Sequence, residues 1–524
     1  MAFKFPALQG YYAYITAFFL GCISVPGFAP FNLFPLTIAS MAGLAVLWHN
    51  RSLRHTLLTA WWYGFGLYSA GASWVYVSIH EYGETPALLA IFMTGLFTAF
   101  LAFFFVIPAG IYHRLKFHRF YLLGFPALWV LSEWLRTWLL TGFPWLFSGY
   151  AFIDTPLSGF APVMGVMGVS FISCLIACCF VAIIKPLLND TETPKTKTSN
   201  PTLDASRYGG VILLLVLSGW GLQQVEWTTL SKSKPISVSL VQGNIPQETK
   251  WSPEMKEYTL KIYPELSSSS WGRDLLIWPE ATIPAFRHEV LEFLETLNTS
   301  GKKSKTTFIT GLPIAETVLN QSRKSEKAYY NSILAMGNGE GVYHKQKLVP
   351  FGEYVPMENW LRGLIPFFNL PMSGFNRGVS DQALLSAGEI KIAPFVCYEI
   401  VYPDLVAKSG KDADLLLTLS NDAWFGESIG PLQHFQMARM RALELGKYLL
   451  RGTNNGVTGI IDHKGKVIAL APQFKALVLQ GEARLTEGST PFSHYGSRPI
   501  LFLAVLIIVS GIIFYRSRQN SGLD

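Results

Sequence analysis

Long apolar stretches fill most of the first 230 residues of this chain, and one more lies near its end. Seven of them precede a long polar region and an eighth follows it, and each approaches the about 20 mostly apolar residues that cross a bilayer as a helix. The pattern predicts a multispan α-helical membrane domain with about eight transmembrane helices. These spans are expected at about residues 10–27, 30–48, 56–78, 86–112, 120–140, 163–186, 209–226 and 498–515.

The polar region between the seventh and eighth stretches has another periodicity, in which strands alternate with helices. Short apolar runs that end at proline, glycine or polar residues indicate strands; they lie at Ile236–Gln242, Leu275–Trp278, Thr307–Gly311, Ile392–Val396 and Asp414–Leu419. Helical spacing runs from His434 to Leu445. The arrangement fits α/β layers with helices outside. We therefore expect a membrane domain over residues 1–231, an α/β domain over 232–490, and a last helix with a short tail over 491–524.

Lysine and arginine are distributed unevenly over the loops between these spans. With the amino terminus in the cytoplasm, the inside loops hold Arg51, Arg54, Arg114, Lys116, Arg119, Lys185, Lys195, Lys197, Arg207, Arg516 and Arg518. The outside loops hold acidic residues and almost no base. This asymmetry sets the orientation of a membrane protein, so residues 232–490 are expected outside the cytoplasm. Residues 191–207 are expected to form a cytoplasmic linker. The first span is expected to be an uncleaved anchor.

Composition agrees with a membrane enzyme and excludes other classes. Half of the residues are hydrophobic, which is too many for an ordinary soluble enzyme. The net charge of +7 is partly a topology signal, so no nucleic-acid partner is needed. The chain lacks HExxH, Walker, GxGxxG and GxSxG patterns, and its histidines show no ligand spacing, so no metal or cofactor is expected.

Cys397 is the one cysteine outside the apolar stretches, at the point where an apolar run meets polar residues. An unpaired thiol in an oxidising compartment is exposed to damage, so its presence there suggests use. Two similar segments precede it, one with Glu280 and one with Lys345. A carboxylate can act as general base, a lysine can stabilise an oxyanion, and a cysteine can carry an acyl group as a thioester.

These three segments resemble the nitrilase, or carbon–nitrogen hydrolase, superfamily. The matching motifs are Trp278-Pro279-Glu280, the Tyr-x-Lys-x-x-Leu context that selects Lys345 over Lys347, and Cys397-Tyr398-Glu399. The resemblance implies an αββα sandwich with a Glu280–Lys345–Cys397 triad at strand ends.

A nitrilase-like domain between the last two spans of a polytopic protein resembles the apolipoprotein N-acyltransferase family over essentially the whole chain. Further motifs that match are Thr141–Trp145, Lys250-Trp251, Leu348–Pro356, Asn421–Phe425 and Thr453–Gly456. The resemblance implies that Glu353, Trp251, Tyr398, Glu399 and Asn331 support the triad.

The same resemblance implies an enzyme of the bacterial inner membrane with its catalytic domain on the periplasmic side. It would move an acyl chain from a phospholipid, typically phosphatidylethanolamine, through a thioester on Cys397 to the α-amino group of a diacylated apolipoprotein. A membrane-tethered amidase acting on a small soluble substrate is the alternative enzyme, and a transporter or scaffold with an inactive domain is a third reading.

Two features remain open at this level. The apolar segment 360–372 between Lys345 and Cys397 is expected to be either an arm that meets lipid or part of the core. Glu133 and Arg136, three residues apart in the fifth span, form either a structural pair or a contact to a lipid headgroup.

Overall fold

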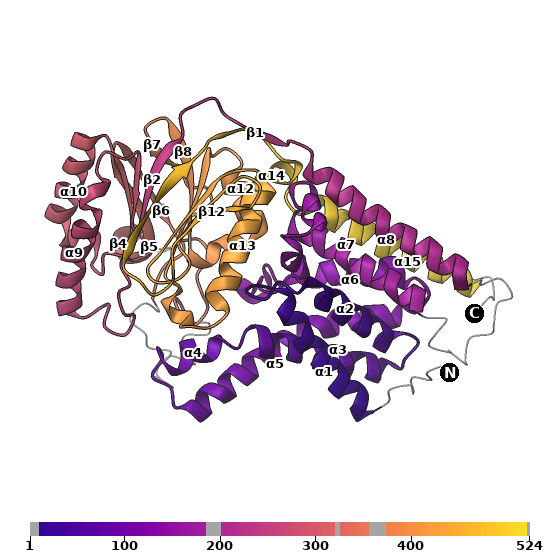
Figure 1. The fold of residues 1–524 in the computed structure, drawn as a ribbon. Coiled ribbons are helices and arrows are strands. Elements are labelled where there is room, and N and C mark those ends of the chain that lie inside the picture. The colour runs from indigo at the N-terminus through magenta and orange to yellow at the C-terminus, as the bar shows by residue number, and fades with distance from the viewer. Residues whose placement is uncertain (1–9, 185–200, 320–324, 356–373, 521–524) are drawn as a thin grey trace. The chain divides into compact units, whose positions relative to one another are not determined.

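The computed structural model describes residues 10–184, 201–319, 325–355 and 374–520, so the apolar segment 360–372 lies outside the described residues. Figure 1 shows the chain as a ribbon. It divides into two compact units: one contains residues up to 73, 91–226 and from 495, and the other contains residues 74–90 and 227–494.

The first unit is built from helices. They are α1 (Tyr11–Ser24), α2 (Phe34–Trp48), α3 (Leu53–Gly71), most of α5 (Ala87–Arg114), α6 (Tyr121–Leu135), α7 (Ala161–Ile184), α8 (Pro201–Gln223) and α15 (Arg498–Asn520). Among the described residues, four apolar helical segments are long enough to cross a membrane: Ala87–Arg114, Pro156–Ile184, Thr202–Gln223 and Arg498–Ser517. Three shorter apolar helical segments lie at Tyr11–Gly27, Phe34–Trp48 and Tyr121–Leu135, so the count of eight spans stays a prediction.

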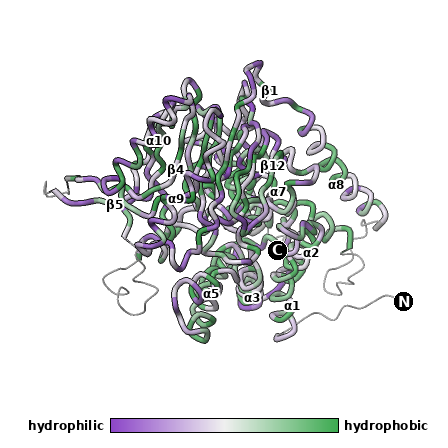
Figure 2. Tube along the Cα trace, turned by 60° about the vertical axis from the view of Figure 1, so that its left-hand side comes forward, coloured by the Kyte–Doolittle hydropathy of each residue, from purple (hydrophilic) through white to green (hydrophobic). Residues whose placement is uncertain are grey.

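Apolar side chains on these helices are exposed in a way that suits lipid. On α5, Phe92 and Leu96 are 65% and 61% exposed, and on α15 Phe502 is 70% exposed. Figure 2 shows α5 largely in the colour of hydrophobic residues. Contiguous exposed apolar surface of this kind is unfavourable in water and favourable in a bilayer. The first unit therefore fits insertion into a membrane.

Close helix packing in this unit depends on small residues. A Cβ added at Gly21 of α1 would lie 2.1 Å from the carbonyl oxygen of Tyr63 in α3, and one added at Gly66 would lie 2.0 Å from that of Phe18. Small residues let helix backbones approach where no hydrophobic effect drives association. The contact between α1 and α3 therefore requires glycine at both positions.

Glu133 and Arg136 are each 1% exposed and hold the irregular segment after α6. Glu133 Oε1 accepts hydrogen bonds from the backbone N–H of Ser148 at 2.8 Å and from Trp129 Nε1 at 3.0 Å. Arg136 donates to the carbonyl oxygen of Trp145 at 2.9 Å. Irregular backbone at membrane depth needs partners inside the protein, so these contacts favour a structural role over a lipid contact.

The second unit contains a two-stranded and a 12-stranded sheet, the latter in the order β12-β11-β10-β9-β8-β7-β6-β5-β4-β3-β2-β13. Its strands are β1 (Thr228–Leu230), β2 (Ile236–Gln242), β3 (Leu275–Ile277), β4 (Thr307–Leu319), β5 (Ser325–Gly337), β6 (Gly339–His344), β7 (Leu385–Ala387), β8 (Ile390–Val396), β9 (Leu415–Ser420), β10 (Leu449–Thr453), β11 (Gly459–Ile461), β12 (Val467–Leu470), β13 (Leu477–Ala483) and β14 (Thr486–Gly488). Strands β2, β3 and β4 run parallel, as do β8, β9 and β10. The helices are α4 (Val75–His80), α9 (Pro253–Ser267), α10 (Leu291–Ser304), α12 (Pro403–Gly410), α13 (Gly430–Leu445) and α14 (Pro491–Tyr495).

The large sheet has one half made of β13 and β2–β6 and another made of β7–β12, and the two halves bury a shared core between them. Leu275 and Ile277 of β3 enter the same cluster as Leu415 and Leu417 of β9. Leu276 points the opposite way, into a cluster with residues of α9 and α10, because neighbouring side chains of a strand alternate between faces. Helices α9 and α10 cover one outer face and α12 and α13 the other (Figure 1). The layers are those of the predicted αββα sandwich.

Residues 74–90 belong to the second unit although they lie between α3 and α5. Ser78 of α4 donates a hydrogen bond to the carbonyl oxygen of Trp424 at 2.7 Å. The ring centroids of Trp74 and Phe425 are 4.5 Å apart. Helix α4 therefore packs on the short helix η11 (Asp422–Phe425), which follows strand β9.

Candidate active site

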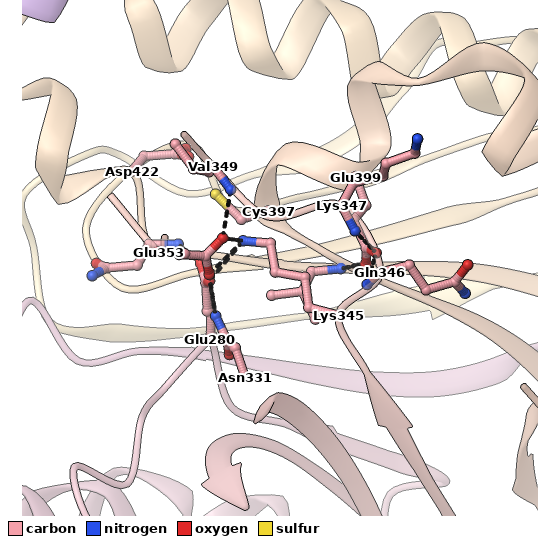
Figure 3. Close-up of polar contacts among 12 residues, drawn as sticks. Glu280, Asn331, Lys345, Gln346, Lys347, Val349, Glu353, Cys397, Glu399 and Asp422 are labelled. Atoms are coloured by element: carbon pink, nitrogen blue, oxygen red, sulfur yellow. Dashed lines mark hydrogen bonds and ion pairs between the residues drawn. The ribbon is translucent and has the colours of Figure 1, made fainter. Parts of the chain in front are cut away.

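The three predicted catalytic residues come together at the ends of strands. Lys345 directly follows β6, Cys397 directly follows β8, and Glu280 lies three residues after β3. Lys345 Nζ is 3.6 Å from Glu280 Oε1. Figure 3 shows Cys397 beside this pair, and its thiol is close enough to both charges to interact with them electrostatically.

Glu353 completes the charge arrangement around Lys345. Its carboxylate lies 2.9 Å from Lys345 Nζ and also accepts a hydrogen bond from the backbone N–H of Val349 at 2.9 Å. Lys345 is 1% exposed, and both glutamates are 7% exposed. One buried ammonium group therefore faces two buried carboxylates, which leaves this cluster with a negative formal charge when all three are ionised.

Burial and these charges shift the pKa values of Lys345 and Cys397. Burial alone would lower the pKa of Lys345, but Glu353 and Glu280 outweigh it, so the pKa of Lys345 is raised and the side chain stays an ammonium. Burial raises the pKa of the Cys397 thiol well above its ordinary value, Glu280 raises it further, and Lys345 opposes both. The resting thiol is therefore protonated, and its attack requires a base at the same moment.

Glu280 is held in place for that task by two donors. Asn331 Nδ2 donates to Glu280 Oε1 at 2.8 Å and also to Glu353 Oε1 at 2.8 Å. The backbone N–H of Asn421 donates to Glu280 Oε2 at 2.7 Å. Asn331 thus bridges the two carboxylates from the middle of strand β5, and its neutral amide separates two like charges.

Glu399 fixes the backbone just before Cys397 and just after Lys345. Its carboxylate accepts hydrogen bonds from the backbone N–H groups of Val396, Gln346 and Lys347 at 2.8, 2.6 and 3.1 Å. It also accepts one from Tyr343 Oη at 3.0 Å. Burial raises the pKa of Glu399 to about 7, and the backbone donors oppose that shift. The segment after β6 and the segment after β8 are therefore tied together through one side chain.

Cys397 itself has φ of 50°, in the left-handed region that non-glycine residues rarely occupy. It opens the short helix η10 (Cys397–Val401) immediately after β8. A residue held in this conformation costs about 1–3 kcal/mol and persists only where its surroundings over-determine it. Sharp turns of this kind present a nucleophile at the end of a strand.

Two family models match the chain in succession. The apolipoprotein N-acyltransferase N-terminal domain matches residues 20–179, and the carbon–nitrogen hydrolase domain matches residues 237–487. The chain is 43% identical to the apolipoprotein N-acyltransferase of Pseudomonas syringae pv. tomato, over 94% of this chain and 95% of that protein. It is 40% identical to the enzyme of that name from Vibrio vulnificus, over 97% of both.

The chain belongs to the apolipoprotein N-acyltransferase family. This confirms the resemblance drawn from the motifs, and it makes the chain an acyltransferase of the carbon–nitrogen hydrolase superfamily. The match to the family's amino-terminal domain covers much of the first unit and also residues 74–90 of the second, and the match to the hydrolase domain lies in the second unit.

Of the five predicted supporting residues of this acyltransferase, three contact the charge cluster or its backbone, namely Glu353, Asn331 and Glu399. Tyr398 follows the nucleophile and packs its ring against Tyr402, with 5.3 Å between centroids. Trp251 is half-buried before α9. Its neighbour Lys250 is 2% exposed and reaches the carbonyl oxygen of Glu280 at 3.4 Å.

A second buried cluster lies behind Cys397; one sequence motif contains Asp422, but the sequence assigned no role to Asp422, His434 or Arg451. His434, Asp422 and Arg451 come from α13, η11 and β10, and each is at most 1% exposed. Within the described ranges, Cys397, Asp422 and His434 are the only His, Cys and acidic residues grouped closely enough to suit a metal ion. Arg451 already neutralises Asp422 at 2.7 Å, which disfavours a cation there.

Proposed function

We propose that the chain N-acylates lipoproteins in two steps through a thioester on Cys397. The observation that carries this proposal is the convergence of Glu280, Lys345 and Cys397 in a chain that matches the family over nearly its whole length. The donor is proposed to be a phospholipid, with phosphatidylethanolamine as the leading candidate, and the acceptor a diacylated apolipoprotein.

In the first step, Glu280 takes the thiol proton while Cys397 Sγ attacks the ester carbonyl of the phospholipid. The C–S bond forms, the ester C–O bond breaks, and the proton passes from Glu280 to the leaving alkoxide, which departs as lysophospholipid. The ammonium of Lys345 stabilises the negative charge that develops on the carbonyl oxygen. Because Lys345 is held protonated by two carboxylates, it keeps this charge throughout the step.

In the second step, the α-amino group of the acceptor attacks the thioester. The C–N bond forms, the C–S bond breaks, and the amine proton returns through Glu280 to the sulfur. Splitting one acyl transfer into two steps through a better leaving group lowers each barrier. The chain then carries the same charges as at the start.

The location follows from the loop charges and the apolar helices. We propose that residues 1–231 and 491–524 are embedded in the bacterial inner membrane and that residues 232–490 face the periplasm. Both lipid substrates then reach the site without leaving the membrane. Single cysteines at Arg51, Arg114 and Lys195 should be labelled by an impermeant maleimide only after permeabilisation, whereas one at Glu84 should be labelled without it; labelling of all four from outside would contradict this orientation.

The activity is tested with a synthetic diacylated lipopeptide whose first residue has a free α-amino group. Purified enzyme in phospholipid vesicles should add one acyl chain to it, and the same lipopeptide acetylated at its amino terminus should remain unchanged because it lacks the nucleophile. Hydrolysis of a small soluble amide, without acyl transfer from phospholipid to the lipopeptide, would instead support the alternative of a membrane-tethered amidase.

A further inference from the structure

The cluster behind the nucleophile contacts Cys397 directly. His434 Nε2 lies 3.2 Å from the carbonyl oxygen of Cys397. On its other side, His434 Nδ1 lies 3.0 Å from Asp422 Oδ1 and 3.0 Å from a terminal nitrogen of Arg451. That same nitrogen of Arg451 donates to Asp422 Oδ2 at 2.7 Å.

The charges in this cluster select one form of the imidazole. Burial lowers the pKa of His434 and Arg451 lowers it further, so the ring is neutral. A neutral ring can donate to the carbonyl of Cys397 only from Nε2–H, and Nδ1 must then be an acceptor. In that form Nδ1 accepts from Arg451, whose charge is balanced by the Asp422 carboxylate. The other neutral tautomer would donate from Nδ1–H to Asp422 Oδ1 at 3.0 Å and would leave the carbonyl of Cys397 without this donor. We therefore take the Nε2–H form, which is the one that contacts Cys397 as a donor.

Two loop motifs identified in the sequence build this cluster. Asp422 comes from Asn421–Phe425, and Gly456 comes from Thr453–Gly456. A Cβ added at Gly456 would lie 2.5 Å from Asp422 Oδ2, so only glycine lets the chain approach the carboxylate. Arg451 Nε donates to the carbonyl oxygen of Val457 at 3.2 Å, which fixes the guanidinium beside the same loop.

We propose that His434 is a positioning residue for the nucleophile: its Nε2–H, presented by Arg451 and Asp422, holds the carbonyl of Cys397 and thereby the left-handed turn that aims Sγ. The inference goes beyond the triad, because His434 exchanges no proton with substrate. The inference rests on the proposed function only where it is tested by the rate of thioester formation. The rate at which a small reagent alkylates Cys397 tests the orientation of the thiol without that function.

The test compares three substitutions of His434 that differ in whether the new side chain can donate a hydrogen bond to the carbonyl oxygen of Cys397. His434→Gln places an amide N–H near the position of Nε2, His434→Asn is too short to reach, and His434→Leu has no donor. Loss of one hydrogen bond of about 1.4 kcal/mol predicts about a tenfold fall in the rate constant for acylation of Cys397 by phospholipid, with KM unchanged. The Asn and Leu variants should show this fall, and the Gln variant should recover to within about threefold of the parent.

Alkylation of Cys397 by iodoacetamide should follow the same order, which separates failure of this inference from failure of the proposed function, because the reagent needs no lipid chemistry. His463→Leu is the matched control, since its ring stacks on Tyr448 with 6.0 Å between centroids; it should leave both rates unchanged. If the Leu variant does not fold, the Asn and Gln pair still decides.

A Gln variant no faster than the Asn variant would overturn the proposal. So would loss of a limb of the pH–rate profile in the Gln variant, because that would assign His434 a proton-transfer role. Retention of the profile with recovered rate is the result the geometry predicts.

Discussion

Glu353→Gln tests whether Lys345 depends on the negative charge of residue 353 or only on the shape of its side chain. It keeps the shape of the side chain and removes one negative charge 2.9 Å from Lys345 Nζ. At that separation two unit charges attract by about 6 kcal/mol with an effective dielectric constant of about 20. Removal of one partner from a buried pair costs about 3–5 kcal/mol. Because the amide oxygen of glutamine still accepts a hydrogen bond, we take the lower end, about 3 kcal/mol.

The consequence should appear in the first chemical step. Without Glu353, the ammonium of Lys345 retains Glu280, 3.6 Å away, as its charged partner, and is drawn toward the base it must not neutralise. We assign this loss to the transition state, where Lys345 must keep its charge free for the developing oxyanion; about 3 kcal/mol there corresponds to about a 10²-fold slower formation of the acyl-enzyme. The assay is single-turnover acylation of Cys397 with phospholipid, followed by quenching and mass measurement.

Glu316→Gln is the matched control for this experiment. Glu316 lies on β4 in the same unit, its side chain is 47% exposed, and it pairs with His344 at 3.3 Å. A partner this exposed contributes little, so the control should retain the parental rate. The reasoning would be refuted if Glu353→Gln acylated within about threefold of the parent while melting at the same temperature.

Three further outcomes follow from the contacts. The pKa of Glu399 is about 7 in the folded state and 4.5 for an ordinary glutamate, so between these two pH values the folded protein holds a proton that the unfolded chain has lost. The free energy of unfolding should therefore fall by about 3 kcal/mol as the pH rises from 4.5 through 7. Glu399→Gln should flatten this fall when unfolding is measured by denaturant titration at several pH values. Ser78→Ala removes the bond to Trp424 and should slow acylation several-fold, whereas Ser73→Ala, which loses only an exposed local bond, should not. Asn331→Leu removes a donor from two carboxylates and should slow acylation by about 10- to 100-fold in the same quench assay; an unchanged rate in a folded variant would contradict its bridging role.

Two members of the triad follow elements that the sequence pattern shows. Glu280 and Cys397 come after the apolar runs of β3 and β8, which end at proline or polar residues. Lys345 follows β6, which has few apolar residues and is antiparallel to β5 and β7, so Lys345 was found from its motif. The pattern predicted α/β layers with helices outside, and the resemblance added the αββα sandwich. Strand β3 is apolar at all three positions, so the sequence alone does not show which of its side chains face the core and which face the helices.

Other parts of the site depend on contacts between distant segments, which single-sequence patterns do not contain. Asn331 lies in the middle of a strand, where an asparagine has no periodic signature, and its bridge to two carboxylates appears only in three dimensions. The cluster of His434, Asp422 and Arg451 joins one helix, one loop and one strand. His434 lies at the start of an amphipathic stretch, so its helical spacing indicated core packing and hid its contact with Cys397.

The fifth apolar stretch shows why helix boundaries were harder to predict. Hydropathy extended it to about residue 140, but α6 ends at Leu135. Beyond it, Leu140 has φ of 52°, and the chain leaves helical geometry. Glu133 and Arg136 supply the hydrogen bonds that this irregular segment lacks, so the apolar character continues while the helix does not.

The thioester on Cys397 is the central claim, and intact-protein and peptide mass spectrometry test it most directly. Enzyme incubated with phosphatidylethanolamine and no acceptor should gain the mass of one acyl group on the peptide that contains Cys397, in stoichiometric yield, with lysophospholipid released. The added mass should be lost on treatment with neutral hydroxylamine, as a thioester is, and should be absent in Cys397→Ala. Acyl transfer to lipopeptide that survives in Cys397→Ala would contradict the account.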